Sequence, residues 1–241
     1  MTSGGREALK WIALILMTGD HVNKVLLDGS QPWLTDLARV VFPIFATVLA
    51  WNVVRHPDPK AAHRSIVRTL LAALLVQPLH AAAFGYWLPL NILFTLGAGL
   101  LVATTRNPLV VLLAGCVAGA FVDYAWAGVL MVVAAAVLAR DPDDWLHRGL
   151  FVLALMVLCW FNGNPWALLA LPILAAGAQL PASLPRWRWA FLGYYAAHLA
   201  VLAVFSGGMD ALRDRIGLAD NMAAASFHEG ATAMYGPRQS R

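Results

Sequence analysis

Residues 9–27 read LKWIALILMTGDHVNKVLL, an apolar stretch in which Asp20 and His21 stand side by side. A helix that crosses a bilayer needs about 20 mostly apolar residues, and this stretch has that length. An ionisable side chain at membrane depth costs at least about 2.5 kcal/mol, so it usually faces a bundle interior or a water-filled cavity. The stretch therefore predicts a membrane-spanning helix with a polar site near one end.

The composition extends this prediction to the whole chain. Of 241 residues, 60% are hydrophobic and 12% are charged, and the mean hydropathy is +0.67, well outside the averages of soluble domains. Cys116 and Cys159 lie inside apolar segments and suggest neither a disulfide nor a metal framework. Because Asp20 and His21 interrupt the first apolar run and no A-x-A site follows, we expect an uncleaved first span. The sequence predicts an integral membrane protein.

Nine apolar segments, separated by joints that contain Pro or Gly, are read as membrane helices, and four of them are short for a span. They cover residues 8–27, 33–54, 64–84, 88–105, 108–122, 125–139, 147–162, 165–180 and 187–206. The predicted fold is all-α, a polytopic membrane bundle of about nine transmembrane helices. We expect one transmembrane domain, residues 1–206, followed by a polar C-terminal tail, residues 207–241.

The basic residues indicate how the bundle is oriented. A cytoplasmic N-terminus puts nearly all of them at cytoplasmic helix ends, in line with the positive-inside bias. These residues are Arg6, Lys10, Arg55, Lys60, Arg64, Arg68, Arg106, Arg140, Arg148, Arg186 and Arg188. The net charge of +4 is therefore read as a determinant of topology, and no nucleic-acid partner is expected.

Three ionisable residues form the first candidate site. Asp20 and His21 lie about seven residues before the end of the first segment, roughly 10 Å deep, and Arg39 lies about six residues into the second segment from the same side. At equal depth, Asp20 and Arg39 can neutralise each other and leave His21 as a titratable group beside them. The alternative is a structural ion pair next to a core histidine.

Further polar residues point to the same half of the bundle. Each of them alone is more often a helix–helix hydrogen bond or an interfacial residue than a catalytic group. They are His80, Asn91, Asp123, Tyr124, Tyr194, Tyr195 and His198. A metal site built from His21, His80 and His198 would lack the fixed short spacings of such sites, so no metal is predicted. The chain has neither G-x-x-x-x-G-K-[ST] nor G-x-G-x-x-G, so nucleotide hydrolysis and Rossmann binding have no support.

Five stretches carry a family resemblance: LKWIALILMTGDH, ARVVFPIFA, LNILFTLGAGLL, VDYAWAGVL and YYAAHL, in this order. Together they resemble the TraX family of conjugation proteins, including its TrbP branch, whose members are membrane enzymes associated with N-terminal acetylation of conjugative pilin. The first stretch is also similar to the opening of membrane acyltransferases, in which a basic residue precedes a histidine by about eleven positions, as Lys10 precedes His21 here. That class usually has Arg-Gly in place of Lys10-Trp11, and many TraX-like sequences have a proline in place of Ala196 or Ala197.

The resemblance implies an acetyl-CoA-dependent N-acetyltransferase of the bacterial inner membrane whose partners are a pilin subunit and membrane lipids. His21 would be the general base, Asp20 would orient its ring, and Arg39 would stabilise the oxyanion or hold a substrate carboxylate. The residues expected to bind the acceptor are Asn91, Asp123, Tyr124, Tyr195 and His198. Those expected to bind the nucleotide end of acetyl-CoA are Lys10, Arg55, Arg64 and Arg68, unless this basic cluster serves orientation and contact with anionic lipids.

Two other functions remain open at this stage. Related conjugation systems do not all acetylate, so the reaction can be another pilin modification, such as head-to-tail cyclisation. The chain can also be a non-enzymatic membrane scaffold that holds pilin subunits, with Asp20 and Arg39 as a structural pair. The sequence leaves the oligomeric state open.

Overall fold

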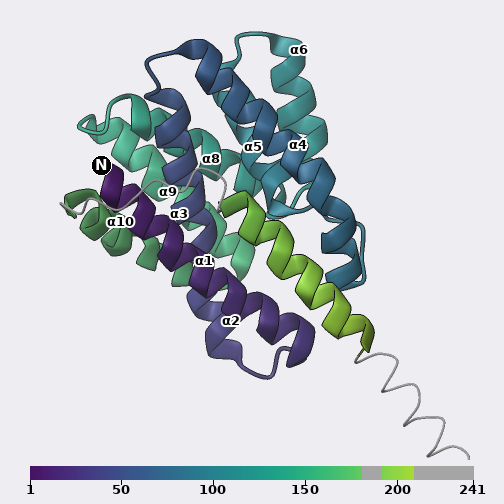
Figure 1. Cartoon of the computed structure of the whole chain (residues 1–241). Coiled ribbons are helices and arrows are strands. Elements are labelled where there is room, and N and C mark those ends of the chain that lie inside the picture. Colours follow the sequence, from purple (N-terminus) through teal and green to yellow (C-terminus); the bar gives the residue numbers. More distant parts are fainter. Residues whose placement is uncertain (181–190, 209–241) are drawn as a thin grey trace, which may run out of the picture.

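The computed structural model describes residues 1–180 and 191–208, which fold into a bundle of helices (Figure 1). The helices are α1 (Ser3–Leu26), α2 (Pro32–Ala38), α3 (Val41–Val54), α4 (Pro59–Phe84), α5 (Ile92–Thr104), α6 (Pro108–Val111), a π-helix (Leu112–Ala118), α7 (Gly119–Phe121), α8 (Ala125–Arg140), α9 (Trp145–Asn162), a 3-10 turn (Trp166–Leu169) and α10 (Ala170–Gln179). A last helix covers Phe191–Gly208.

These elements confirm the all-α prediction, since each of the nine predicted segments contains a helix where the structure describes it. Within the described residues, the β-structure amounts to one isolated bridge between Leu90 and Val122. Four regions are long and apolar enough to cross a membrane: Pro32–Val54, Pro59–Phe84, Trp145–Asn162 and Phe191–Gly208. A crossing by all nine stays a prediction. Residues 209–241 of the predicted tail, and Arg186 and Arg188, lie outside the described residues.

Helix ends follow local capping chemistry. The hydroxyl of Thr2 accepts the N–H of Gly5 at the start of α1, and the carboxylate of Asp58 accepts the N–H of Lys60 at the start of α4. Gly85 and Gly163 end α4 and α9 in the left-handed region, with φ of 78° and 70°, where a glycine is least strained. The loop that follows Gly85 carries Tyr86, a residue of the candidate site.

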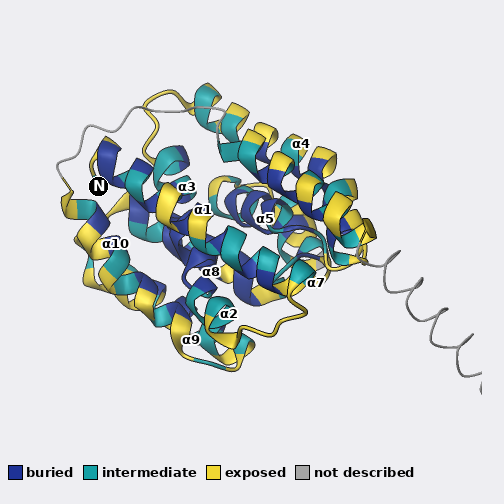
Figure 2. Cartoon of the chain, turned by 60° about the horizontal axis from the view of Figure 1, so that its bottom comes forward, coloured by how far each residue is buried: buried dark blue, intermediate teal, exposed yellow. Residues whose placement is uncertain are grey.

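Figure 2 shows that α5 and α8 are largely buried in the centre of the bundle, whereas α4, α9 and α10 turn exposed residues outward. Small residues allow the close contacts. A side chain at Gly99 of α5 would overlap Val132 of α8, and one at Gly177 of α10 would overlap Leu9 of α1. The half of α1 that precedes the candidate site is thereby held tightly against α10, so the position of Asp20 and His21 is fixed by packing.

Candidate active site

A cavity of about 260 Å³ lies at the C-terminal end of α1, and we call it the histidine cavity. Its lining comes from α1, the α2–α3 junction, α4, the loop after α4, the turn before α8, and the end of α9. The residues are His21, Lys24, Arg39, His80, Phe84, Tyr86, Asp123, Tyr124, Phe161 and Asn162. The structure therefore brings His21 and Arg39 to one cavity, as their similar depth predicted.

The His21 ring is hydrogen-bonded to His198 of the last helix, with 2.9 Å between Nδ1 of His21 and Nε2 of His198. The Nδ1 atom of His198 lies 3.1 Å from the carbonyl oxygen of Tyr194, which can only accept. In the neutral pair, Nδ1 of His198 therefore carries the proton and its Nε2 accepts from Nδ1 of His21. This chain of bonds leaves Nε2 of His21 as the nitrogen that can take a proton.

Asp20 does not pair with Arg39, which corrects the predicted ion pair. Its carboxylate is 2.6 Å from the ammonium of Lys24, one helical turn further along α1. An i,i+4 pair needs no second helix, and Lys24 can reach a nearly buried carboxylate from the cavity side. Asp20 also does not orient the ring of His21, because His198 holds that ring.

A double-mutant cycle tests this pairing. We expect Asp20→Asn and Lys24→Met to couple by about 1 kcal/mol in thermal unfolding in detergent, since the Lys24 side chain is 43% exposed and solvent screens the pair. Asp20→Asn and Arg39→Met should be additive. Coupling of Asp20 with Arg39 instead of Lys24 would contradict the structure.

Asp123 and Tyr124 reach the cavity from a strained turn. Tyr124 and Ala125 have φ values of 59° and 45°, which residues with a side chain rarely adopt. The turn is held by Leu90, whose carbonyl accepts the N–H of Asp123 at 2.9 Å, and by the Thr95 hydroxyl, which donates to the carbonyl of Asp123 at 2.7 Å. Such over-determined strain is typical of functional sites.

Aromatic rings close the walls beside this turn. The Tyr124 ring stacks on Phe42 with a centroid distance of 4.6 Å, and Tyr86 lies near His80 and Phe84. Burial, and after it the charges of Asp123 and Asp20, raise the pKa of the Tyr86 phenol. Tyr86 is therefore a neutral hydroxyl at neutral pH and can donate a hydrogen bond into the cavity.

Three residues predicted to bind the acceptor do not line the cavity: His198, which instead bonds to His21, and Asn91 and Tyr195. Asn91 is fully buried, caps α5 through the N–H of Leu93, and donates to the carbonyl of Ala73 and the side chain of Gln77. Tyr195 is 2% exposed and packs in the core against the ring of His198. The structure gives Asn91 and Tyr195 structural contacts.

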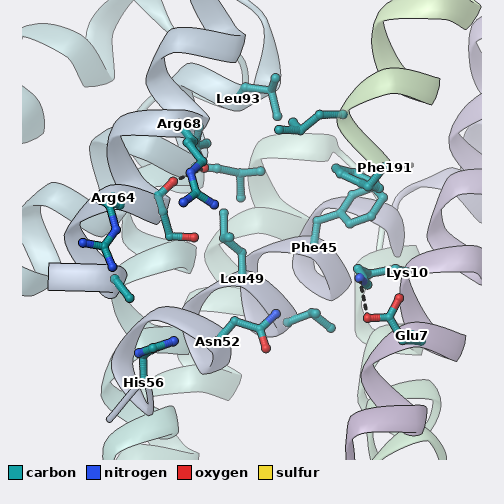
Figure 3. A pocket seen from close by; sticks show the side chains of 16 residues that line it. Glu7, Lys10, Phe45, Leu49, Asn52, His56, Arg64, Arg68, Leu93 and Phe191 are labelled. Atoms are coloured by element: carbon teal, nitrogen blue, oxygen red, sulfur yellow. Dashed lines mark hydrogen bonds and ion pairs between the residues drawn. The ribbon is translucent and has the colours of Figure 1, made fainter. Parts of the chain in front are cut away.

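A second and larger cavity, of about 600 Å³, lies toward the other end of α1 (Figure 3), and we call it the basic pocket. Lys10, Arg64 and Arg68 line it together with Asn52 and His56. Figure 3 shows Arg64 and Arg68 across the pocket from Lys10, which pairs with Glu7 at 2.7 Å. A different part of the wall is apolar and contains Phe45, Leu93 and Phe191.

Arg55, the fourth residue of the predicted donor site, does not line this pocket. Its Nε donates to the carbonyl of Ala139 at 2.9 Å, and its guanidinium lies over the Trp51 ring, 4.9 Å from the centroid. These contacts tie the end of α3 to the end of α8. The structure thus gathers three of the four predicted basic residues and leaves Arg55 in a structural position.

The two cavities lie at opposite ends of α1. Lys10 and His21 are eleven residues apart on this helix, which at 1.5 Å per residue is roughly 16 Å along the axis. Thr18 lies between them, and its hydroxyl is 2.9 Å from that of Tyr194 on the last helix. A ligand that uses both cavities must therefore be long and narrow between its two ends.

Sequence reasoning missed several cavity residues. Lys24 was not predicted to belong to the site, although its i,i+4 spacing from Asp20 is a readable signal. Phe84 and Tyr86, which were also missed, lie on either side of Gly85, the residue at which α4 ends. Asn162 precedes Gly163 in the sequence FNGNP, which is typical of a helix end and turn and so carries no functional signal of its own.

Comparison with known proteins agrees with the resemblance. Residues 5–206 match the family described as TraX protein. A Protein TraX of Escherichia coli is 31% identical over 222 residues, which cover 84% of this chain and 88% of that protein. Another from Escherichia coli strain K12 is 32% identical over 224 residues, with the same coverage. No solved structure matches the chain. By the extent of these matches, the chain belongs to the TraX family.

Proposed function

We propose that the protein is a membrane-embedded acyltransferase that transfers an acetyl group from acetyl-CoA to the N-terminal amine of a conjugative pilin. The observation that carries this proposal is His21, which lines a cavity together with Arg39 and is hydrogen-bonded to His198 behind it. The pair supplies a base with a defined free nitrogen, and the guanidinium supplies positive charge for an oxyanion. Acyl transfer to an amine needs both.

The base acts through a fixed ring. The backbone carbonyl of Tyr194 holds His198, and His198 holds Nδ1 of His21, so the lone pair of Nε2 is kept available for the amine proton. When Nε2 gains that proton, His198 can still accept from Nδ1–H. His198 takes the orienting role that a carboxylate has in a serine-hydrolase triad.

Asp123 supports the binding of an amine. Its carboxylate lines the histidine cavity, and the turn that carries it is held on both sides. An ammonium group next to Asp123 would be close to the base that deprotonates it. Asp123 is thus proposed to bind the incoming N-terminus, with the hydroxyls of Tyr86 and Tyr124 as further polar contacts.

The basic pocket fits the phosphate-bearing end of acetyl-CoA. Arg64, Arg68 and Lys10 supply three cationic side chains, which suit phosphate groups, while Phe45 and Leu93 form an apolar wall. The distance along α1 matches a donor whose charged end is far from its reacting end. We propose that the donor enters from the cytoplasmic side, that the N-terminus of the chain lies in the cytoplasm, and that the membrane is the bacterial inner membrane.

Incubation of the purified protein with pilin and labelled acetyl-CoA tests this function by the intact mass of the pilin. We expect a gain of one acetyl group at the pilin N-terminus. Loss of water or of a peptide fragment would indicate cyclisation or another processing reaction. An unchanged pilin that still binds the protein would indicate a scaffold.

The donor pocket is tested by charge reversal. We expect Arg64→Glu with Arg68→Glu to raise the KM for acetyl-CoA at least about tenfold, because a hydrogen bond to a charged group contributes about 1.5–3 kcal/mol. The value of kcat should change little, since both residues are far from the histidine cavity. The Arg64–Asp58 pair is largely exposed, so its loss should not unfold the protein.

Arg106→Glu is the matched control, because Arg106 is an exposed basic residue outside the pocket. It makes the same change of net charge per site and should leave the KM for acetyl-CoA unchanged. An equal rise of KM in this control would mean that the donor responds to the overall charge of the protein rather than to this pocket.

A further inference from the structure

Residues of the histidine cavity carry unpartnered polar atoms. Among the described residues, four buried side-chain atoms have no hydrogen-bond partner, and three of them belong to residues that line this cavity: Nε of Arg39, Nδ2 of Asn162 and Nδ1 of His80. The side chains of Arg39 and Asn162 also touch each other, with 3.4 Å between Nη1 of Arg39 and Oδ1 of Asn162. Buried polar atoms are nearly always hydrogen-bonded, so these unpartnered donors on residues of the cavity wall are available to an acceptor.

The chemistry of Arg39 identifies which side-chain atoms of the two residues still lack a hydrogen-bond partner. A guanidinium group only donates, so the atom of Asn162 that faces it must be the amide oxygen. The other end of the amide is then the NH₂ group. Both unfilled groups, Nε–H of Arg39 and the NH₂ of Asn162, are donors, and the ligand atom that completes them is an acceptor.

Backbone hydrogen bonds fix the positions from which both side chains extend. Asn162 is the last residue of α9, where the N–H groups of Gly163 and Asn164 bond back to the carbonyls of Trp160 and Cys159. Arg39 lies at the α2–α3 junction, where its N–H bonds to the carbonyl of Asp36 at 3.1 Å. Donors that are fixed before the reaction stabilise developing charge without the cost of reorganisation.

On the basis of the proposed acyl transfer, we propose that Asn162 and Arg39 bind the oxygen of the carbonyl group under attack. Nε2 of His21 first takes the ammonium proton and releases it to water, and the neutral amine nitrogen then bonds to the carbonyl carbon while the π electron pair moves to the oxygen, which the two donors stabilise. Nε2 of His21 takes the proton that the nitrogen loses. As the C=O bond re-forms, the C–S bond breaks and the thiolate leaves with the proton from His21.

Asn162→Asp removes the NH₂ donor without changing the shape of the side chain. One oxygen still faces Arg39, and a second oxygen replaces the NH₂ group. We expect kcat to fall by about 10²–10³-fold, the effect of losing one oxyanion donor. The KM for acetyl-CoA and for pilin should stay within about threefold, since the contact is strongest in the transition state. The melting temperature in detergent should stay the same or rise, because the new carboxylate pairs with Arg39.

Asn107→Asp is the control, since Asn107 caps α6 on the exposed surface and Asp caps equally well. Asn162→Ser, which keeps a donor, should retain more of kcat than Asn162→Ala, and this comparison decides if Asn162→Asp fails to fold. A normal kcat in Asn162→Asp, or a loss confined to KM, would overturn the inference and leave the proposed function standing. A wild-type protein that transfers no acetyl group would overturn both.

Discussion

We expect His21→Asn to abolish the proposed acetylation of the pilin N-terminus while the protein still folds and inserts. The amide NH₂ of an asparagine reaches the place of Nδ1 and can still donate to Nε2 of His198, so the packing of α1 against the last helix is kept. Nε2, the nitrogen that takes the proton, is lost. Loss of a general base lowers the rate by roughly 10²–10⁴-fold, which brings modification to background. Intact mass of the pilin measures the result, and the melting temperature in detergent checks the fold.

His198→Gln is the matched variant. The side-chain oxygen of a glutamine reaches the place of Nε2 and can accept from Nδ1–H of His21, so the tautomer of His21 is preserved. We expect this variant to keep much more activity than His198→Lys, whose ammonium only donates and cannot accept that bond. Wild-type modification by His21→Asn, together with loss of activity in His198→Gln, would move the base to His198.

The fold was predictable because the bilayer leaves few alternatives. Backbone groups in lipid must be satisfied within a helix, so apolar length and the Pro and Gly joints between segments predict where helices lie. The irregular region Pro108–Phe121, with its π-helix, still appeared as an apolar segment. The hydropathy of this segment does not reveal that it contains a π-helix.

The sequence predicted only some of the residues that form the site. Equal depth correctly placed His21 and Arg39 at one cavity, but depth says nothing of rotation about the helix axis. Asp20 therefore took Lys24 on its own helix as partner instead of Arg39. A contact between residues i and i+4 of one helix requires less ordering of the side chains than a contact between two helices. It therefore forms in preference to a contact between residues that merely lie at equal depth.

Residues in turns were the hardest to assign. Asn91 and Asn162 both lie at the end of a helix, where Asn is common for local reasons. Asn91 satisfies its own cap and its neighbours in α4, whereas the NH₂ group of Asn162, a residue of the cavity wall, has no hydrogen-bond partner. The difference lies in the partners that the rest of the chain supplies, which no single-sequence pattern contains.

Cysteines at Ser30 and His63 give opposite labelling in intact cells. In a variant without Cys116 and Cys159, we expect an impermeant maleimide to label Ser30→Cys and to leave His63→Cys unlabelled until the cells are opened. Ser30 lies in the exposed loop after α1, and His63 is an exposed residue near the start of α4. Both sites are therefore reachable by the reagent when it is on their side of the membrane.

This labelling decides whether the two cavities can serve two compartments. With Ser30 outside, the histidine cavity faces the side on which the processed pilin end is exposed, and the basic pocket faces the cytoplasm, where acetyl-CoA is found. Donor and acceptor then approach from opposite ends of α1, in agreement with the eleven residues between Lys10 and His21. The reverse pattern would put the cationic pocket outside, against the positive-inside bias. Arg64 and Arg68 could then not meet a cytoplasmic donor, and the assignment of the basic pocket would have to be abandoned.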